Sequence, residues 1–384
     1  MSLITQPSTA FHGEKIHSYD QYVKGNETRF TAVSSLLAKT MLEWSGDKLS
    51  TAKFTADDLA RELGVKESQS QLFVALLKTL VRSGHLSEVD GWYTLNAFDS
   101  ASLDRLVASL YNEGLSVLNL DQQTMEAIRP GFELARICIP NLPAVLQGEL
   151  SGVQLLFSAD NFAYSTAIYG DHIQEVYYGL IAEQIVKKCF EIWSETPDRQ
   201  IRILEIGAGS GKGTMRMLEA LRPYGNRVHF CFTDIGNSFL RRAKQAFKDF
   251  DFSFDFRLLD IGQDPEAQGF SAESFDIAFA TNVLHATPDL RDTLRNTAWL
   301  LAPQGNVYIN EIAHDLAVNT VSFGTTPGWW LPDDGLRLPY SPVATTQTYR
   351  ALLQSLNFER ISIVGYPGVS EAELVQAIIH GVKK

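Results

Sequence analysis

A run of glycines in the middle of the chain has the spacing of a loop that holds a cofactor. The run reads Glu-x-Gly-x-Gly-x-Gly and contains Glu205, Gly207, Gly209 and Gly211. Closely spaced glycines let the backbone approach a ligand that a side chain would exclude. The spacing predicts a loop around the methionine part of S-adenosylmethionine, with Glu205 near its amino end.

The same stretch also contains Gly-Lys, which suggests a loop that holds nucleotide phosphates. Such a loop needs a glycine five residues before the Gly-Lys pair and a Ser or Thr directly after it. Ile206 and Gly213 occupy those two positions. A dinucleotide-binding pattern fails too, because Lys212 stands at its third glycine position. The resemblance to a phosphate loop is therefore superficial.

Two later acidic residues strengthen the cofactor interpretation. Asp234 ends the next strand-like segment, where a carboxylate can accept both ribose hydroxyls. Asp260 ends the third segment and could meet the adenine amino group, with Ile261 beside it. Each acid could instead cap the helix that follows it. Because ligands of open α/β sheets bind at the carboxyl ends of the strands, acids at three strand ends favour one shared cofactor crevice.

A histidine and a glutamate occupy the same rim. His285 follows the fourth strand-like segment and Glu311 ends the fifth. Successive strands are usually neighbours, so we expect the two side chains to meet beside the methyl donor. Glu311 would fix the tautomer of His285 and raise its basicity, which makes a general base for a carbon acid or a hydroxyl. The alternative is that His285 caps a helix and Glu311 makes an unrelated structural bond.

The segments that must position these residues alternate after residue 200. Strand-like runs cover 202–207, 229–234, 252–260, 275–282 and 306–311, and helical runs cover 214–223, 239–247 and 290–302. This alternation is typical of a parallel sheet covered by helices. The tail adds a helix over 346–358 and at least one late strand.

Residues 55–96 predict a compact unit of two helices and a hairpin. The first helix begins after the N-cap Thr55, the second ends at Gly84, and the hairpin turns at Asp90-Gly91. This order resembles a winged helix, which would make a cofactor-binding DNA regulator conceivable. However, residues 51–100 carry five Lys or Arg against seven Asp or Glu. A structural role is therefore favoured over DNA binding.

Residues 101–195 are expected to be mostly helical. One helix over 177–193 places apolar residues on a single face, namely Tyr177, Ile181, Ile185, Cys189 and Ile192. The aromatic and polar stretch 158–171 before it is either a pocket lining or a surface loop. The turn-rich segment 194–200 predicts a boundary between domains 1–195 and 196–384.

The composition limits the classes of partner. The 384 residues carry a net charge of −12, which argues against non-specific nucleic-acid binding and repels acidic proteins unless a local basic patch intervenes. No apolar stretch is long enough to span a membrane, and no secretory signal is visible. The three cysteines lack metal-ligand spacing, so we expect no metal and a cytoplasmic location.

Several motifs together resemble the C-methyltransferase domains of polyketide synthases. They are LEIGAGSGKGT, FTDIGNSFL, LDIGQDPEAQGF, SFDIAFATNVLHATPDLRDTLRN and SFGTTPGWW. The resemblance is continuous from about residue 200 to 366 and extends more loosely upstream. It implies a Rossmann-like class I core with a mostly parallel seven-stranded sheet, preceded by a helical lid that contains the winged-helix-like unit.

The resemblance also implies a reaction. Such domains use S-adenosylmethionine to methylate the α-carbon of a β-ketoacyl thioester on an acyl carrier protein, among other polyketide synthase domains. The catalytic His–Glu pair of the family falls on His285 and Glu311. O-methylation of a hydroxyl or enol remains the alternative, because a histidine base serves both reactions.

The resemblance further suggests residues around the acceptor. Asn282 is expected to stabilise the enolate or contact the cofactor, and Tyr178 is a further candidate for enolate stabilisation. The pocket is expected to be lined by Tyr169, Tyr177, Trp329 and Trp330. For the two tryptophans, packing in the core is the alternative.

Overall fold

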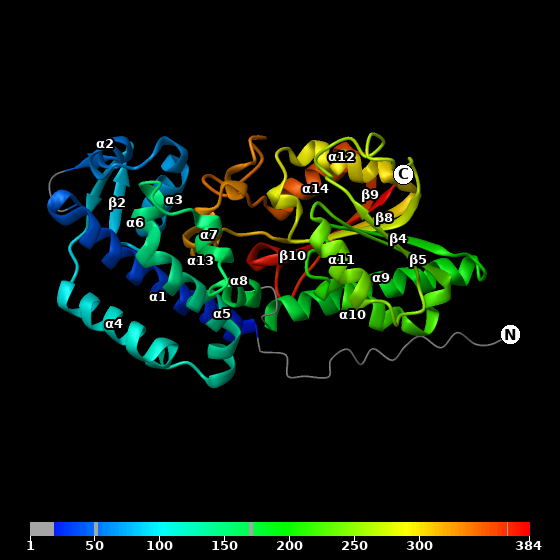
Figure 1. Ribbon diagram of the computed structural model, residues 1–384, viewed down its shortest axis with the longest axis horizontal. Coiled ribbons are helices and arrows are strands. Elements are labelled where there is room, and N and C mark those ends of the chain that lie inside the picture. The colour runs from blue at the N-terminus through cyan, green and yellow to red at the C-terminus, as the bar shows by residue number, and fades with distance from the viewer. Residues whose placement is uncertain (1–18, 50–52, 169–171, 367) are drawn as a thin grey trace.

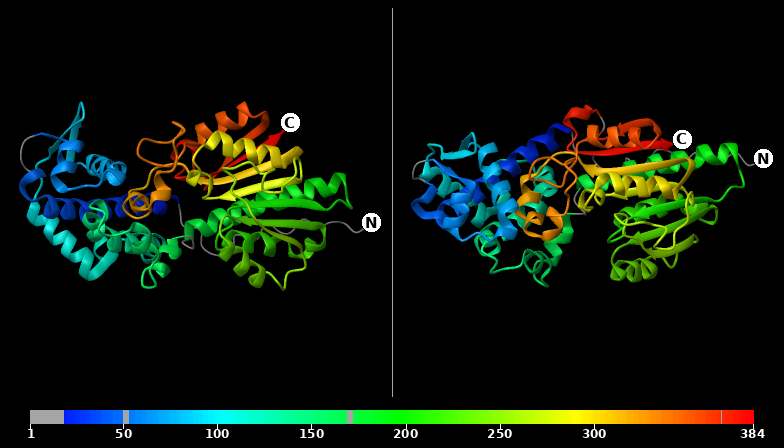
Figure 2. Two further views of the ribbon diagram at one scale, coloured as in Figure 1. Left: turned by 45° about the horizontal axis from the view of Figure 1, so that its top comes forward. Right: turned by 90° about the horizontal axis from the view of Figure 1, so that it is seen from above.

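The computed structural model describes residues 19–49, 53–168, 172–366 and 368–384. The molecule is elongated, with a mainly helical N-terminal half and a half built around a large sheet (Figure 1). In Figure 2 the residues around α13 (Ala317–Val321) lie between the two halves. Among the described residues, no helix is long and apolar enough to cross a bilayer.

The large sheet has seven strands in the order β6-β5-β4-β7-β8-β10-β9. The strands are β4 (Ile201–Ile206), β5 (Val228–Asp234), β6 (Ser253–Leu258), β7 (Phe275–Thr281), β8 (Leu301–Ile312), β9 (Phe358–Val364) and β10 (Gln376–Lys383). The first five pair in parallel, and β10 is antiparallel to both β8 and β9. This confirms the mostly parallel seven-stranded sheet expected of a class I methyltransferase core.

The strand order places the cofactor crevice. Chain order reverses between β4 and β7, and ligands of such sheets bind at the carboxyl ends of the strands next to that reversal. The glycine loop follows β4, and the turn that carries His285 follows β7. The two predicted halves of the site therefore meet at one edge of the sheet.

Helices cover both faces of the sheet (Figure 1). On one face lie α9 (His172–Glu195), α10 (Lys212–Leu221) and α11 (Asn237–Ala246), and on the other lie α12 (Leu290–Leu300) and α14 (Thr346–Ser355). The helix α10 shows why such segments form, since it buries Thr214, Met217, Leu218 and Leu221 at helical spacing.

The N-terminal half contains eight α-helices among the described residues, namely α1 (Tyr19–Ser45), α2 (Ala56–Leu63), α3 (Ser70–Arg82), α4 (Ser100–Glu113), α5 (Gln122–Cys138), α6 (Leu142–Leu146), α7 (Gly152–Phe157) and α8 (Phe162–Ala167). A small sheet in the order β1-β3-β2 accompanies them, with β1 (Phe54–Thr55), β2 (Leu86–Val89) and β3 (Trp92–Leu95). This agrees with the expected helical N-terminal region.

The winged-helix-like unit forms as the local signals predicted. The Thr55 side chain accepts a hydrogen bond from the backbone N–H of Asp58 at 3.1 Å and caps α2. Asp90 and Gly91 both have positive φ, as a tight two-residue hairpin turn requires. The helix α3 ends two residues before Gly84, and its apolar face packs against α1, α6 and α13. The second helix of the unit therefore packs in the hydrophobic core of the helical half.

Two hydrophobic clusters make up the interior. Ile181 and Ile185 of α9 belong to the cluster around the large sheet, as does Cys189. Val318 and Val321 of α13 belong to the cluster of the helical half, although they follow the sheet's fifth strand in the chain. The division at residue 195 stays a prediction. Residues that follow it, such as those of α13, pack in the core of the helical half.

Candidate active site

The glycine loop adopts a backbone that side chains would not allow. Gly207, Gly209 and Gly211 all have positive φ, between 55° and 76°. A Cβ at Gly207 would lie 2.5 Å from the Cγ1 atom of Val283, so the loop packs directly on the turn after β7. At Gly209 the nearest atom to such a Cβ is 4.0 Å away, and the space there is open. The loop therefore offers bare backbone toward the crevice.

Glu205 is buried beneath this loop at the end of β4. The Thr214 hydroxyl donates to its Oε2 atom at 2.6 Å. Burial, which disfavours the charged form, raises the pKa of Glu205 to about 8, and the nearby Asp234 carboxylate adds to the shift. A cationic ligand would reverse this shift, so the site suits the positively charged amino group of S-adenosylmethionine.

Asp234, at the end of β5, is hydrogen-bonded to the same loop. Its Oδ2 atom accepts from the backbone N–H of Gly209 at 2.9 Å, and its Oδ1 atom accepts from that of Gly236 at 2.8 Å. The next residue, Ile235, is 76% exposed and lines the cavity described below. The role of Asp234 at the ribose stays a prediction, and its bond to Gly209 shows that it also positions the loop.

Asp260 lies two residues beyond the end of β6. Its Oδ1 atom accepts from the backbone N–H of Gly262 at 3.0 Å, and the Gln268 side chain bonds to both its backbone N–H and its carbonyl. The side chain of Ile261 is buried in the sheet's core. The contact of either residue with adenine stays a prediction.

His285 and Glu311 meet as predicted. The Nδ1 atom of His285 lies 2.8 Å from the Oε2 atom of Glu311. The Oε1 atom of Glu311 accepts from the backbone N–H groups of Val283 at 2.8 Å and Leu284 at 2.6 Å. Because β7 and β8 are parallel neighbours, the glutamate of one strand reaches the turn that follows the other. The carboxylate is 1% exposed, so the pair is fixed in one geometry.

A buried ion pair holds the histidine turn from its other side. Arg337 pairs with Asp334 at 3.1 Å, with both side chains almost fully buried. The guanidinium also donates to the carbonyl oxygens of Leu284 and Thr287, which flank the turn, at 3.4 and 3.2 Å. The Leu284 carbonyl already accepts from the Thr287 backbone N–H and hydroxyl, and Arg337 adds a charged donor to it and to the Thr287 carbonyl. Arg337 therefore positions His285 through the backbone.

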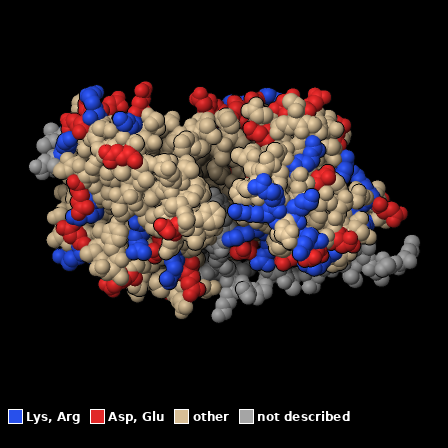
Figure 3. Space-filling model, in the orientation of Figure 1, with Lys and Arg blue, Asp and Glu red and all other residues tan. Residues whose placement is uncertain are grey.

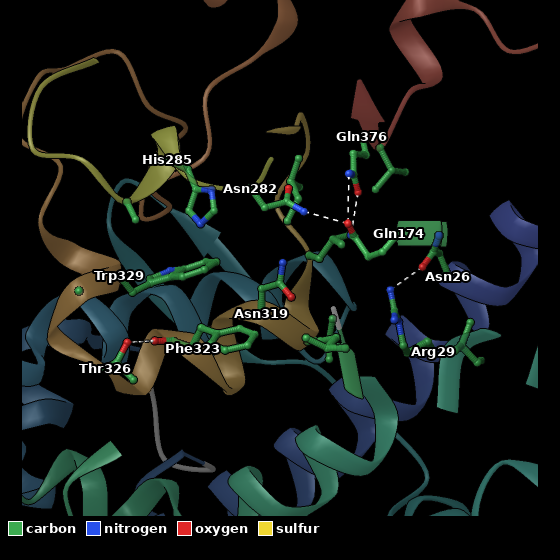
Figure 4. A pocket seen from close by; sticks show the side chains of 18 of the residues that line it. Asn26, Arg29, Gln174, Asn282, His285, Asn319, Phe323, Thr326, Trp329 and Gln376 are labelled. Atoms are coloured by element: carbon green, nitrogen blue, oxygen red, sulfur yellow. Dashed lines mark hydrogen bonds between the residues drawn. The ribbon is translucent and has the colours of Figure 1, made fainter. Parts of the chain in front are cut away.

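His285 faces a cavity of about 370 Å³ between the two halves of the molecule (Figure 4). Trp329 forms a neighbouring wall, with its ring centroid 6.2 Å from that of His285. The remaining walls come from both halves, with Asn26, Arg29, Thr124 and Ile128 from the helical half. The volume and mostly apolar walls suit a small acyl chain.

A network of amides crosses the cavity wall beside His285 (Figure 4). The Nδ2 atom of Asn282 donates to the Oε1 atom of Gln174 at 2.9 Å, and Gln174 bonds in turn to Gln376. This leaves the Oδ1 atom of Asn282 buried with no partner. An orphaned acceptor can accept from an ammonium group but not from an enolate oxygen, which has no proton to donate. The contact of Asn282 with the cofactor or the enolate stays a prediction.

Comparison with known proteins decides the class of the enzyme. Residues 204–307 match a family profile described as a methyltransferase domain. Polyketide synthase ThaQ of Burkholderia thailandensis is 34% identical over 231 residues, 59% of this chain. The crystal structure of the CurJ carbon methyltransferase is 28% identical, has a TM-score of 0.75, and covers 94% of this chain and 92% of its own. The crystal structure of the DszA carbon methyltransferase is 25% identical, has a TM-score of 0.81, and covers 95% of this chain and 92% of its own.

The chain is an S-adenosylmethionine-dependent methyltransferase, and over almost its whole length it is similar to carbon methyltransferases. The resemblance read from the motifs is thereby confirmed. The stretch shared with polyketide synthase ThaQ spans 11% of that protein, so this methyltransferase corresponds to a small part of the relative's length.

The structure separates the aromatic residues expected in the acceptor pocket. Trp329 lines the cavity of the methyltransferase, but Trp330 packs in the helical core and donates its Nε1–H to the Gly324 carbonyl. The Tyr177 hydroxyl donates to the backbone carbonyl of Gln376, and the Tyr177 ring is buried in the core around the large sheet. Neither Trp330 nor Tyr177 lines the cavity, because each turns toward a core.

Two other tyrosines were also expected near the acceptor. Tyr178 is buried and packs beside Gly213, at the start of α10 near Glu205, and it is absent from the cavity wall. This places Tyr178 at the cofactor loop, away from the expected enolate. Tyr169 lies outside the described residues.

Several polar residues in the cavity are not among those predicted from the sequence. Asn26 and Arg29 come from α1, Gln174 from α9, and Asn319 from the segment after β8. Only Gln376 carried a signal, because a glutamine inside an otherwise apolar strand must be satisfied when it is buried. The others became visible only when the helical half was placed against the sheet.

Cofactor affinity should depend on pH through Glu205. Because the pKa of Glu205 is raised to about 8, the carboxyl holds a proton at neutral pH in the free protein, and binding of the cationic cofactor releases it. We expect the affinity for S-adenosylmethionine to rise severalfold per pH unit from pH 6 to 7.5. Calorimetry in buffers of different ionisation enthalpy should show about one proton released per cofactor bound.

Two variants check that assignment. Glu205→Gln should bind with little dependence on pH, whereas Glu219→Gln, an exposed carboxyl on α10, should behave as the wild type. Proton release that persists in Glu205→Gln would contradict the assignment. In the absence of cofactor, the raised pKa makes Glu205 favour the folded state at low pH, and this contribution is lost as the pH rises through about 8.

Proposed function

We propose that this methyltransferase adds a methyl group to the α-carbon of a β-ketoacyl thioester held on an acyl carrier protein, with His285 and Glu311 as the base. The observation that carries the proposal is the buried 2.8 Å bond between Nδ1 of His285 and Glu311 at the wall of an acyl-sized cavity. The names of the similar carbon methyltransferases and of polyketide synthase ThaQ support it.

The geometry gives each member of the pair a role. Glu311 can only accept hydrogen bonds when ionised, so it keeps the proton of His285 on Nδ1 and leaves Nε2 to act as the base. The C–H bond at the α-carbon breaks, the proton moves to Nε2, and the electron pair spreads over the two flanking carbonyl groups. The carbanion carbon is then the methyl acceptor. Bound S-adenosylmethionine would supply the methyl group as an electrophile, and the electrons of the broken S–CH₃ bond would stay on its sulfur, which leaves as part of S-adenosylhomocysteine.

The remaining proposals concern the surroundings of this step. The glycine loop, Glu205, Asp234, Asp260 and Ile261 hold the cofactor, together with Asn282. Residues 1–195 act as a lid, since α1 and α5 supply one wall of the cavity. Carrier proteins and neighbouring polyketide synthase domains are the partners, and the cytoplasm is the location.

Trp329 is the best-placed donor for the enolate. Its Nε1–H is buried without a partner, and its ring packs against that of His285. A buried donor with no partner is costly, and the developing enolate oxygen would satisfy it. We expect Trp329→Phe to lower kcat by about 10- to 100-fold with little change in cofactor affinity. The matched variant Trp330→Phe, which loses a structural bond to Gly324, should lower stability and leave kcat nearly unchanged.

Intact-mass analysis tests the proposed function. A carrier protein loaded with acetoacetyl thioester is incubated with enzyme and S-adenosylmethionine, and the product is reduced and hydrolysed. We expect a mass gain of one or two methyl groups that survives both treatments, because a C–C bond is stable to them. A methyl group that is lost in acid would identify an enol ether and would contradict C-methylation.

A further inference from the structure

The outward side of α11 carries a patch of positive charge, which we call the basic face. It consists of Arg241, Arg242 and Lys244 of α11 and of Lys248, two residues beyond the end of the helix, all exposed. The helix itself contains no acidic residue. No carboxylate of a described residue forms an ion pair with any of the four within 4.0 Å. Figure 3 shows Lys and Arg side chains gathered in this region, over α10 and α11.

The basic face does not stabilise the fold. The opposite side of α11 packs on the sheet through Leu240 and Ala243, and Phe247 continues that contact. Arg241 and Arg242 instead line a shallow depression at the surface, together with Ser238 and Gln245. Adjacent unpaired cations repel one another and contribute nothing to folding. Their arrangement is therefore better explained by a binding partner.

The basic face lies beside the entrance to the acceptor cavity. Ile235 lines that cavity and is 76% exposed, so the cavity reaches the surface there. Only Gly236 separates Ile235 from the first residue of α11. Since a helix rises 1.5 Å per residue, Arg241 stands about 6 Å along α11 from its start. In Figure 3 the blue side chains border the hollow between the two halves.

We propose that the basic face of α11 docks the acidic surface of the carrier protein that delivers the acyl chain. The inference rests on the proposed function, because a tethered substrate requires its carrier to sit at the cavity entrance. The whole chain has a net charge of −12 and would repel an acidic protein. A local cluster of cations at the entrance would attract an acidic protein there, despite the overall repulsion, and would favour one orientation of the carrier.

Steady-state kinetics with two substrates test this docking. The double variant Arg241→Glu/Arg242→Glu is compared with the wild type on an acetoacetyl carrier protein and on an acetoacetyl pantetheine thioester that lacks the protein. We expect kcat/KM for the carrier substrate to fall at least about tenfold at low salt, mostly through KM. The loss should shrink at 0.5 M salt, because salt screens exposed charges. The kcat/KM for the free thioester should stay within about twofold.

A matched control separates the basic face from total charge. Lys53→Glu/Lys66→Glu makes the same change in net charge at two exposed lysines, one in the winged-helix-like unit and one just before it, and should leave kcat/KM for both substrates unaffected. The proposal is overturned if the α11 variant keeps wild-type kcat/KM on the carrier, if it loses equally on the free thioester, or if the control loses as much. Inactivity of the wild type on both substrates would instead count against the proposed function.

A nucleic acid is the other partner that a cationic helix could attract. Gel-shift assays with a short RNA and a short DNA duplex at the same salt provide the comparison. Because most of the chain is acidic, we expect no binding at micromolar protein. Binding that disappears in the Arg241→Glu/Arg242→Glu variant, with carrier kinetics unchanged, would assign the basic face to nucleic acid and overturn the proposal.

Discussion

The His285→Ala variant should lose methyl transfer by about 10²- to 10⁴-fold while binding S-adenosylmethionine as the wild type does. The imidazole makes its described polar contact with Glu311, and its other ring nitrogen is the base in the proposed reaction. Without it, no residue lining the described cavity offers a neutral nitrogen base, since the remaining polar groups are amides, threonine hydroxyls, an indole and a guanidinium.

The control for this variant is a histidine near the start of β5. His229 also pairs with a carboxylate, through Nε2 to Asp255 at 3.2 Å, but it lies outside the cavity. His229→Ala should keep nearly full activity. Calorimetry should give the same cofactor affinity for His285→Ala as for the wild type. Activity within a few fold of the wild type in His285→Ala would remove the base from the mechanism.

The Glu311→Gln variant should lose about 10²- to 10³-fold in kcat, although it changes one atom. The oxygen of the new amide can still accept from the backbone N–H groups of Val283 and Leu284. Its NH₂ group then faces Nδ1 of His285 and can only donate, so Nδ1 must accept. The imidazole proton moves to Nε2, and the base is blocked by the wrong tautomer.

Two measurements distinguish this tautomer effect from simple damage to the fold. Nitrogen NMR of a sample labelled at histidine should show the proton of His285 on Nδ1 in the wild type and on Nε2 in Glu311→Gln. Asp255→Asn makes the same chemical change at the His229 pair and should leave kcat within about twofold. If Glu311→Gln keeps the wild-type tautomer and still loses activity, the carboxylate acts in some other way than by orienting His285.

The predictions from the sequence that the structure confirms rest on local physics. Thr55 caps its helix because its hydroxyl meets an N–H three residues away. The glycines of the loop all have positive φ, which residues with a side chain rarely adopt, and at Gly207 a Cβ would also clash with Val283. The contact of His285 with Glu311 follows from one rule of topology, that successive strands of an α/β sheet are often neighbours.

What the sequence could not provide depends on how the helical half packs on the sheet. Gln174 and Gln376 bond across 202 positions of the chain, and no local pattern encodes that distance. The expectation that Tyr177 and Trp330 line the pocket rests on the family resemblance, which does not determine the direction of a side chain. Their direction is set by the phase of the helix or turn that carries them, and both point into a core.

The central claim is that the His285–Glu311 pair removes a proton from the α-carbon of the acyl thioester. Exchange of that proton for deuterium measures the step directly, in heavy water, with an acetoacetyl carrier protein and without S-adenosylmethionine. We expect the wild type to wash deuterium into the α-position well above the rate without enzyme, and His285→Ala and Glu311→Gln to fall to that background. Equal exchange by the wild type and His285→Ala would contradict the account.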